Sequence, residues 1–210
     1  MNDEPVTIRR ADLSDAARIS YVLAAALHHD PLARWLFPDD ADRLRRQPAF
    51  YQVLTEHALT WGLVHTTPDY DGAALWLHHN GTSAPDIEHA DRLRTALGPN
   101  TDRYAALARL LAQHHPHGLP HAHLPLIAVV PECQGHGIGT TLLHKQLSQL
   151  DTDQVPAYLA ASTKRSQRLY ERLGFRPVGN LIDIPRGPQL RPMWRQQPHW
   201  SAAVARKPPP

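Results

Sequence analysis

A glycine-rich segment, PECQGHGIG, occupies residues 131–139 and directly follows an apolar run. Gly135, Gly137 and Gly139 let the backbone turn sharply, so that several N–H groups can point to one place. Leucines at helical spacing over 142–150 then predict a helix, whose first turn adds unpaired N–H groups and a positive dipole end. The segment predicts a phosphate or pyrophosphate site, although a plain glycine-rich turn would give the same pattern.

Two common nucleotide-binding loops do not fit this segment. No Gly-Lys-Ser or Gly-Lys-Thr follows the glycines, which excludes a Walker loop. A dinucleotide-binding loop belongs beside a first strand, with an acidic residue about 20 positions further on, whereas this loop comes late in the chain.

The elements on either side of the loop are predicted from hydrophobic periodicity. The apolar run 124–130 indicates a central strand buried on both faces. A second short strand is expected at 157–161, followed by a helix at 163–173 that Gly174 closes. The chain is expected to return to strand at Phe175, and strands at 181–184 and 189–194 would finish the sheet.

The first half of the chain alternates strands and helices in the same way. Alternation over 6–10 predicts an edge strand, and Ser14 is placed to cap the helix after it. The other expected elements are a helix that begins at 38–40 and ends at Gly62, hairpin strands at 63–67 and 73–79, and helices at 86–97 and 101–114. The order predicts an α/β (α+β) domain with a mixed, mostly antiparallel sheet.

Composition bounds the class of protein. The chain has 210 residues and 23.5 kDa, which predicts one domain over 1–196 with a Pro-rich, disordered tail over 197–210. Its net charge of +2 disfavours nucleic acid as a partner. No apolar run approaches the roughly 20 residues that cross a bilayer, and the N-terminus lacks a signal-peptide pattern. With Cys133 as the single cysteine, we expect no disulfide and a cytoplasmic location.

Two motifs resemble the GNAT superfamily of N-acetyltransferases. AVVPECQGHGIGTTLL is similar to its acetyl-CoA-binding motif, with Gln134, Gly137 and Gly139 at the characteristic positions. RLYERLGF is similar to its second motif, with Tyr170 followed by Gly174 and Phe175. Within the superfamily the chain is most similar to puromycin N-acetyltransferase-like enzymes. That resemblance covers most of residues 5–195 and is specific only after Leu124.

The resemblance implies a GNAT fold of about six or seven strands flanked by helices, with splayed central strands. It implies acetyl-CoA as cosubstrate, bound by backbone groups of the strand end and by the loop. The implied cofactor-binding residues are Ala128, Val129, Val130, Gln134, Gly135, His136, Gly137, Ile138, Gly139, Thr140, Thr141, Thr163 and Ser166.

Acetyl transfer to an amine requires two proton movements. A primary amine with a pKa near 10.4 must lose a proton before it attacks a thioester, and the departing thiolate needs a donor. The motif match makes Tyr170 the candidate general acid. His121 and His123, which precede the central strand, are the candidate bases, and a water relay is the alternative. Relatives carry a Glu where this chain has Ala160, and often an Asn where it has Thr163.

The resemblance places the acceptor pocket between the first two helices and the last hairpin. Its candidate substrate-binding residues are Asp30, Trp35, Phe37 and Trp194. The implied acceptor is a primary amine of a small molecule, possible roles being antibiotic resistance or self-protection. A peptide or protein amine is the alternative, and the oligomeric state cannot be read from these patterns.

Two competing hypotheses remain. Because Ala160 replaces the relatives' Glu, the chain could bind acetyl-CoA without turning it over. The histidine tract over 114–123 could instead chelate zinc or nickel through His114, His115, His117, His121 and His123. No acidic or cysteine ligand group accompanies that tract in the sequence, so no metal is expected.

Overall fold

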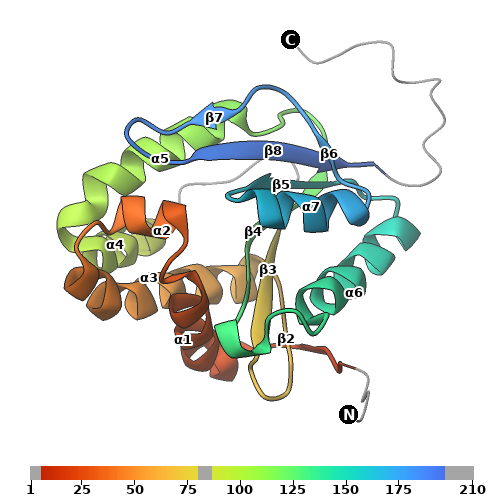
Figure 1. Cartoon of the computed structure of the whole chain (residues 1–210), viewed down its shortest axis with the longest axis horizontal. Helices are drawn as coiled ribbons and strands as arrows, with labels where there is room; N and C mark the ends of the chain where they lie inside the picture. Colours follow the sequence, from red (N-terminus) through yellow and green to blue (C-terminus); the bar gives the residue numbers. More distant parts are fainter. Residues whose placement is uncertain (1–5, 80–86, 197–210) are drawn as a thin grey trace.

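A computed structural model describes residues 6–79 and 87–196 of the chain. One sheet runs through it in the order β1-β2-β3-β4-β5-β8-β6, and β7 pairs with β8 (Figure 1). The strands are β1 (Arg9–Arg10), β2 (Gly62–Thr66), β3 (Gly72–His79), β4 (His121–Val129), β5 (Ala157–Ala161), β6 (Arg176–Pro177), β7 (Ile182–Asp183) and β8 (Gln189–Arg195). The expected mixed and mostly antiparallel sheet is confirmed.

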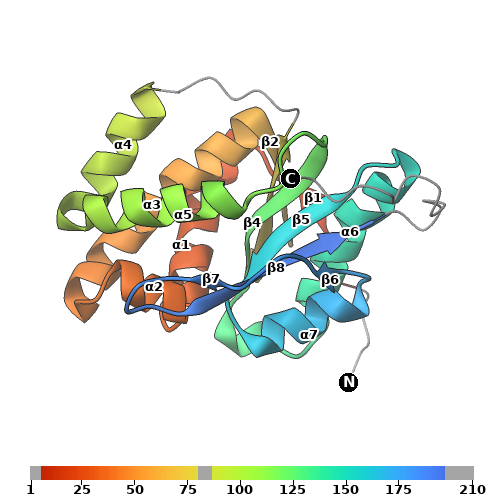
Figure 2. The same cartoon turned by 90° about the horizontal axis from the view of Figure 1, so that it is seen from above.

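Helices cover both faces of the sheet. They are α1 (Ala16–Leu27), α2 (Pro31–Leu36), α3 (Asp40–Trp61), α4 (Ile87–Leu97), α5 (Thr101–His114), α6 (Ile138–Thr152) and α7 (Lys164–Arg172). Seen from above, the first five lie on one side of the sheet and α6 and α7 on the other (Figure 2). Each side has its own core, one around Leu23, Phe37 and Leu75, the other around Leu142 and Phe175.

The central strands β4 and β5 separate along their length. They run parallel, but the register pairs only Ala122 with Ala157 and His123 with Tyr158. Beyond this joined end the two strands diverge, so their other ends, near Val129 and Ala161, form an open end (Figure 1). The expected splay is confirmed. It also explains why Leu126 and Ile127 of β4 are only half-buried, where burial on both faces was expected.

Several sequence-based expectations need correction. A short 3-10 helix, Leu13–Asp15, precedes α1, and Asp12 rather than Ser14 caps it, because Asp12 has an extended backbone and accepts a hydrogen bond from Ser14 N. The helix α1 then begins after Asp15 without a side-chain cap. The edge strand is shorter than expected, with only Arg9–Arg10 paired to β2. Between the first helix and the one expected to begin at 38–40, the chain forms a further helix, α2, because Asp30 caps it and Pro31 occupies its first turn. The predicted tail over 197–210 lies outside the described residues.

Candidate active site

The glycine loop links the open end of β4 to α6. Gly135 and Gly137 have φ angles of +89° and +83°, the left-handed conformation that glycine adopts without strain. A Cβ atom added at either position would meet nothing within 4 Å, so the loop faces open space. Gly137 begins α6 without a side-chain cap. The first N–H groups of α6 are therefore available to an anion.

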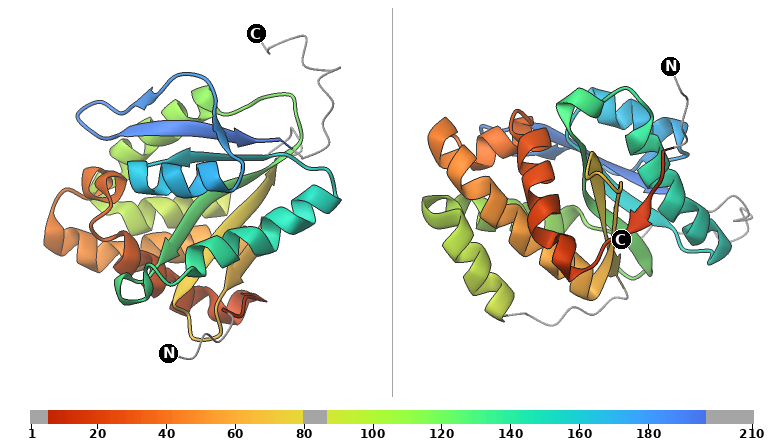
Figure 3. Two further views of the ribbon diagram at one scale, coloured as in Figure 1. Left: turned by 45° about the vertical axis from the view of Figure 1, so that its right-hand side comes forward. Right: turned by 90° about the horizontal axis from the view of Figure 1, so that it is seen from below.

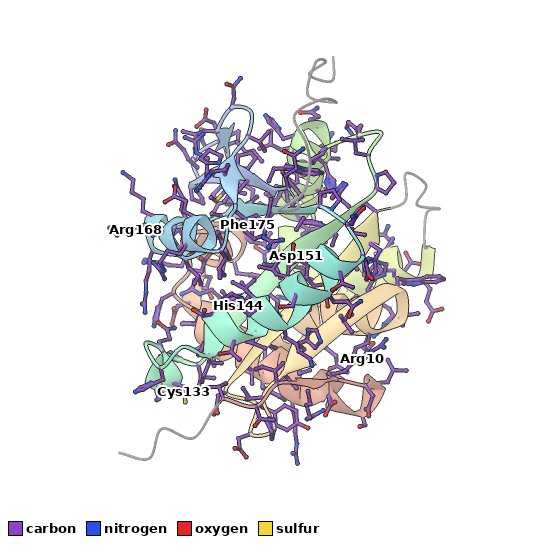
Figure 4. All side chains as sticks on the ribbon, turned by 90° about the vertical axis from the view of Figure 1, so that its right-hand side faces the viewer. Arg10, Cys133, His144, Asp151, Arg168 and Phe175 are labelled. Carbon is purple, nitrogen blue, oxygen red and sulfur yellow. The ribbon has the colours of Figure 1, made fainter. Side chains whose placement is uncertain are left out.

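Positive side chains flank this loop. Arg165, in the first turn of α7, donates a hydrogen bond of 3.0 Å to Gln134 Oε1. Gln134 in turn donates to the carbonyl of Val129 at 3.0 Å, which ties the loop to the strand end. Arg168 projects from α7 on the side of the molecule where Cys133 lies (Figure 4). Arg165 is exposed, and sequence reasoning had not singled it out.

The remaining loop residues divide into exposed and structural ones. His136 is exposed, whereas Ile138 is buried in the core beneath α6. Thr141 Oγ1 donates to the carbonyl of Gly137. A Cβ atom added at Gly139 would lie 3.7 Å from the Val129 side chain, so the first turn of α6 packs closely on β4. Thr140 is half-buried in the same turn. Burial, with Asp71 nearby, raises the pKa of the Cys133 thiol, which is the wrong direction for a nucleophile.

The end of β4 presents backbone groups toward the opening. Ala128 and Val129 pair with β3 on one side, through Ala73 and Gly72. On the side facing β5, the register that the structure describes extends no further than His123. The edge formed by Ala128, Val129 and Val130 is therefore placed to receive an added strand-like ligand.

Thr163 and Ser166 form reciprocal hydrogen bonds at the start of α7. Thr163 Oγ1 accepts from Ser166 N at 3.1 Å, and Ser166 Oγ lies 3.3 Å from Thr163 N, which makes a capping box. Their side chains thus fix the direction in which α7 leaves β5.

Tyr170 projects from α7 into the core on that side of the sheet. Its ring is buried and packs edge-to-face on Phe175, with 5.9 Å between ring centroids. Burial and the negative charge of Asp30 raise the pKa of the Tyr170 phenol. The hydroxyl is therefore protonated at neutral pH and can donate a hydrogen bond.

Asp30 brings a negative charge from the opposite layer of the fold. Its Oδ1 accepts from Leu32 N at 2.8 Å, and its Oδ2 accepts from Ser162 Oγ at 2.9 Å. Ser162 directly follows β5, so Asp30 lies at the open end of the strands. The pKa of Tyr51 on α3 is also raised, chiefly because the side chain is buried and to a lesser extent because of the negative charge of Asp30. Asp30 and Ser162 thus meet from separate elements, and the charge of Asp30 acts on Tyr170. Ser162 and Tyr51 carried no sequence signal.

The three aromatic residues expected around an acceptor occupy different places. Trp35 donates from Nε1 to the carbonyl of Pro185 at 3.1 Å, and so joins α2 to the β7–β8 connection. Phe37 is 0 % exposed and packs on Phe50, so it is a core residue. Trp194 contacts the ring of His121, at the joined end of β5. Of the three, only Trp35 connects the first helices to the last hairpin.

His121 and His123 lie at the start of β4, at the joined end of the two strands. His121 is 2 % exposed, and its Nδ1 lies 2.7 Å from the carbonyl of Leu119. Rings of His79 and His115 pack against both. The structure therefore separates these histidines from the open end, where Asp30 and Tyr170 lie.

A surface groove of about 920 Å³ lies elsewhere, between α3 and α4. Arg46, Gln52, Asp91 and Arg92 are among its lining residues. It shares no residue with the loop or with Tyr170, and the chemistry described above does not involve it.

Comparison with known proteins agrees with this geometry. The sequence profile of the family described as acetyltransferase (GNAT) domain matches residues 99–193, from the turn between α4 and α5 to β8. An uncharacterised N-acetyltransferase of Schizosaccharomyces pombe is 35 % identical over 89 residues. That match covers 41 % of this chain and 37 % of the yeast protein.

Solved structures extend the similarity over the whole fold. A histone acetyltransferase HPA2-related protein of Corynebacterium glutamicum has a TM-score of 0.67 and 22 % identity, covering 92 % of this chain and 97 % of its own. The NatC complex bound to Gag peptide and CoA has a TM-score of 0.52 and 12 % identity, and the match covers 92 % of this chain and 99 % of the NatC chain. The chain has the GNAT fold, and residues 99–193 are the part that matches the GNAT acetyltransferase domain.

No helix in the described part of the chain is both long and apolar enough to span a membrane.

Proposed function

We propose that this chain transfers an acetyl group from acetyl-CoA to the primary amine of a small molecule. One observation carries the proposal. The strands β4 and β5 part at an open end that has an anion-binding loop with free N–H groups on one side, and the half-buried Asp30 and the buried Tyr170 on the other. The family match supports the donor, since GNAT acetyltransferases use acetyl-CoA.

The residues present fit acetyl-CoA. The open space before Gly135 and Gly137 suits a pyrophosphate, because N–H groups of the loop and of the first turn of α6 face it. Arg165 adds a positive charge beside the loop. Beyond His123, no strand that the structure describes pairs with the β5 side of β4 (Figure 3). The amide groups of a pantetheine arm can add at Ala128–Val130 as a strand does, where Gln134 Nε2 donates to the Val129 carbonyl in this structure.

Tyr170 is proposed to serve the leaving group. Its raised pKa keeps the hydroxyl neutral, so it can donate a hydrogen bond to the sulfur as negative charge develops there. Because a thiol has a lower pKa than a phenol, the hydroxyl need not give up its proton permanently. Its main effect is stabilisation of the departing thiolate.

Asp30 is proposed to favour a cationic amine. A carboxylate has more acceptor positions than the hydrogen bonds from Leu32 N, Ala33 N and Ser162 Oγ use. Its charge therefore attracts an ammonium group to the open end and holds it near Tyr170.

The reaction balances without another reagent. The neutral amine forms a C–N bond to the acetyl carbonyl carbon, the C–S bond breaks, and the proton that the amine loses ends on the CoA sulfur. The products are an N-acetyl amine and free CoA thiol. His121 and His123 lie at the other end of β4, so we assign proton removal from the amine to water at the open end rather than to these side chains.

The test is amine-dependent release of CoA thiol from acetyl-CoA. The panel contains puromycin and other aminonucleosides, aminoglycosides, polyamines and short peptides. Release with small cationic amines supports the proposal, and an antibiotic role follows only if an antibiotic is among them. Release with peptides alone would reassign the acceptor to a peptide or protein amine. Binding of acetyl-CoA without release on any amine would favour a non-catalytic binding protein.

A further inference from the structure

Four histidines gather at the joined end of β4 and β5, away from the proposed active site. His79 ends β3, His115 follows α5, and His121 and His123 begin β4. The closest ring centroids, those of His79 and His115, are 4.2 Å apart, and those of His115 and His123 are 4.9 Å apart. We call these four residues the histidine cluster. Its members come from three segments, so the fold and not the sequence spacing assembles it.

The nitrogen atoms in this cluster are close enough to share one ion. One ring nitrogen from each of His79, His115 and His123 lies within 4.8 Å of the other two. In a tetrahedral zinc site with Zn–N bonds of about 2.0–2.1 Å, ligand nitrogens are about 3.3 Å apart. Binding of zinc would require the three rings to rotate until their nitrogens reach that spacing, and all three rings are half-buried.

The surroundings of the cluster favour the neutral imidazole, which is the form that binds a metal ion. Burial, reinforced by the other histidines, lowers the pKa of His115 to about 4 and that of His123 well below its usual value. The pKa values of His79 and His121 are lowered for the same main reason. A neutral imidazole has one unprotonated nitrogen, and this is the atom that binds a metal ion.

A backbone hydrogen bond holds the ring of His121 in one orientation beside the other three histidines. Its Nδ1 lies 2.7 Å from the carbonyl of Leu119, and a carbonyl can only accept, so Nδ1 carries the proton. Its Nε2 then has the lone pair and lies 3.2 Å from His115 Nε2. A backbone carbonyl that fixes a histidine in this way is typical of metal sites. Tyr158 and Trp194 cover the cluster from β5 and β8.

We propose that His79, His115 and His123 bind one zinc-type divalent metal ion, with water or His121 Nε2 at the fourth position. The ion would join the end of β3 to the α5–β4 connection and to the start of β4. Its role is structural, because the cluster lies at the opposite end of β4 from the glycine loop. Neighbouring His114 and His117 are exposed, and His114 bonds the carbonyl of Leu110, so neither belongs to the site.

The test is calorimetric titration of Zn²⁺ into chelator-treated protein without a His tag. We expect one ion per chain, and about tenfold or greater weakening in His115→Gln and in His79→Gln. The matched controls are His114→Gln and His117→Gln, which should bind as the wild type does. Circular dichroism and acetyl-CoA affinity report whether each variant is folded.

A second probe keeps the proposal testable if a cluster variant fails to fold. Co²⁺ added to the wild type should give the intense visible absorption of a tetrahedral site, at one equivalent. No tight site in the wild type, several weak sites, or equal losses in the control variants would each overturn the proposal. An octahedral Co²⁺ spectrum would overturn it as well, because surface histidines would then account for the binding.

Discussion

Ser162 donates a hydrogen bond of 2.9 Å to Asp30 Oδ2 across 132 residues of sequence. The bond joins the end of β5 to the cap of α2, which belong to different layers of the fold. It fixes the Asp30 carboxylate where its charge acts on the phenol of Tyr170. A half-buried negative charge is thereby held where it acts on the group proposed to serve the leaving thiolate.

Removal of the Tyr170 hydroxyl should slow turnover. Tyr170→Phe keeps the ring that packs on Phe175, so the fold and acetyl-CoA binding should be unchanged. We expect kcat to fall at least tenfold, which corresponds to about 1.4 kcal/mol of activation free energy. Steady-state kinetics and calorimetry measure the two quantities. An unchanged kcat in a chemistry-limited assay would remove Tyr170 from the mechanism.

A side chain in the glycine loop should block the donor site. Gly137→Glu adds an acidic group to an open cradle at a φ of +83°, so acetyl-CoA binding should be lost in calorimetry. Gly118→Glu is the matched control, because Gly118 has a φ of +78°, also faces open space, and lies outside the loop. Equal affinities in the two variants would refute the placement of the pyrophosphate.

Neutralising Asp30 should weaken binding of the acceptor amine and leave binding of acetyl-CoA unchanged. Asp30→Asn keeps an oxygen for the cap of α2 but removes the charge, so KM for a cationic amine should rise about tenfold while acetyl-CoA affinity stays the same. Asp39→Asn is the control, since Asp39 caps α3 in the same manner. A similar rise in both variants would mean that helix capping, not charge, matters.

Asp15 should make stability depend on pH. It accepts hydrogen bonds from Arg9 at 2.7 and 2.8 Å and from the Tyr70 hydroxyl at 2.6 Å, and the Arg9 contact chiefly lowers the pKa of Asp15. A lowered carboxyl pKa stabilises the fold above the unfolded value, near 3.9, and the benefit fades as pH falls below it.

Asp15→Asn should therefore lower the free energy of unfolding by about 1–3 kcal/mol at pH 7. The difference from the wild type should shrink below about pH 4, where the unfolded carboxyl is protonated. Urea unfolding at pH 7, 5 and 3 measures it. A difference that is constant across this range would contradict the proposed linkage.

Local patterns in the sequence predicted most elements of the fold. The strand 157–161, the helix after the glycines and the closing Gly174 each depend on neighbours within a few residues, and each was predicted at its place. The prediction of Ser14 as the N-terminal cap was wrong, because Asp12 and Ser14 are both good capping residues and backbone geometry selects between them.

The contacts that complete the site could not be predicted in this way. Asp30 and Ser162 meet only through packing of separate layers, and no pattern links them. His79 joins the histidine cluster because β3 pairs with β4 in antiparallel register, which places it opposite His121. A linear tract of histidines could not supply that residue.

The central claim is direct acetyl transfer at the open end of β4 and β5. Its most direct test incubates protein, acetyl-CoA and the best amine of the panel, then measures CoA thiol and the mass of the amine together. The account predicts one acetyl group on the amine for each thiol released, with the rate lowered at least tenfold in Tyr170→Phe. Thiol release without acetylated amine, or equal rates for wild type and variant, would contradict it.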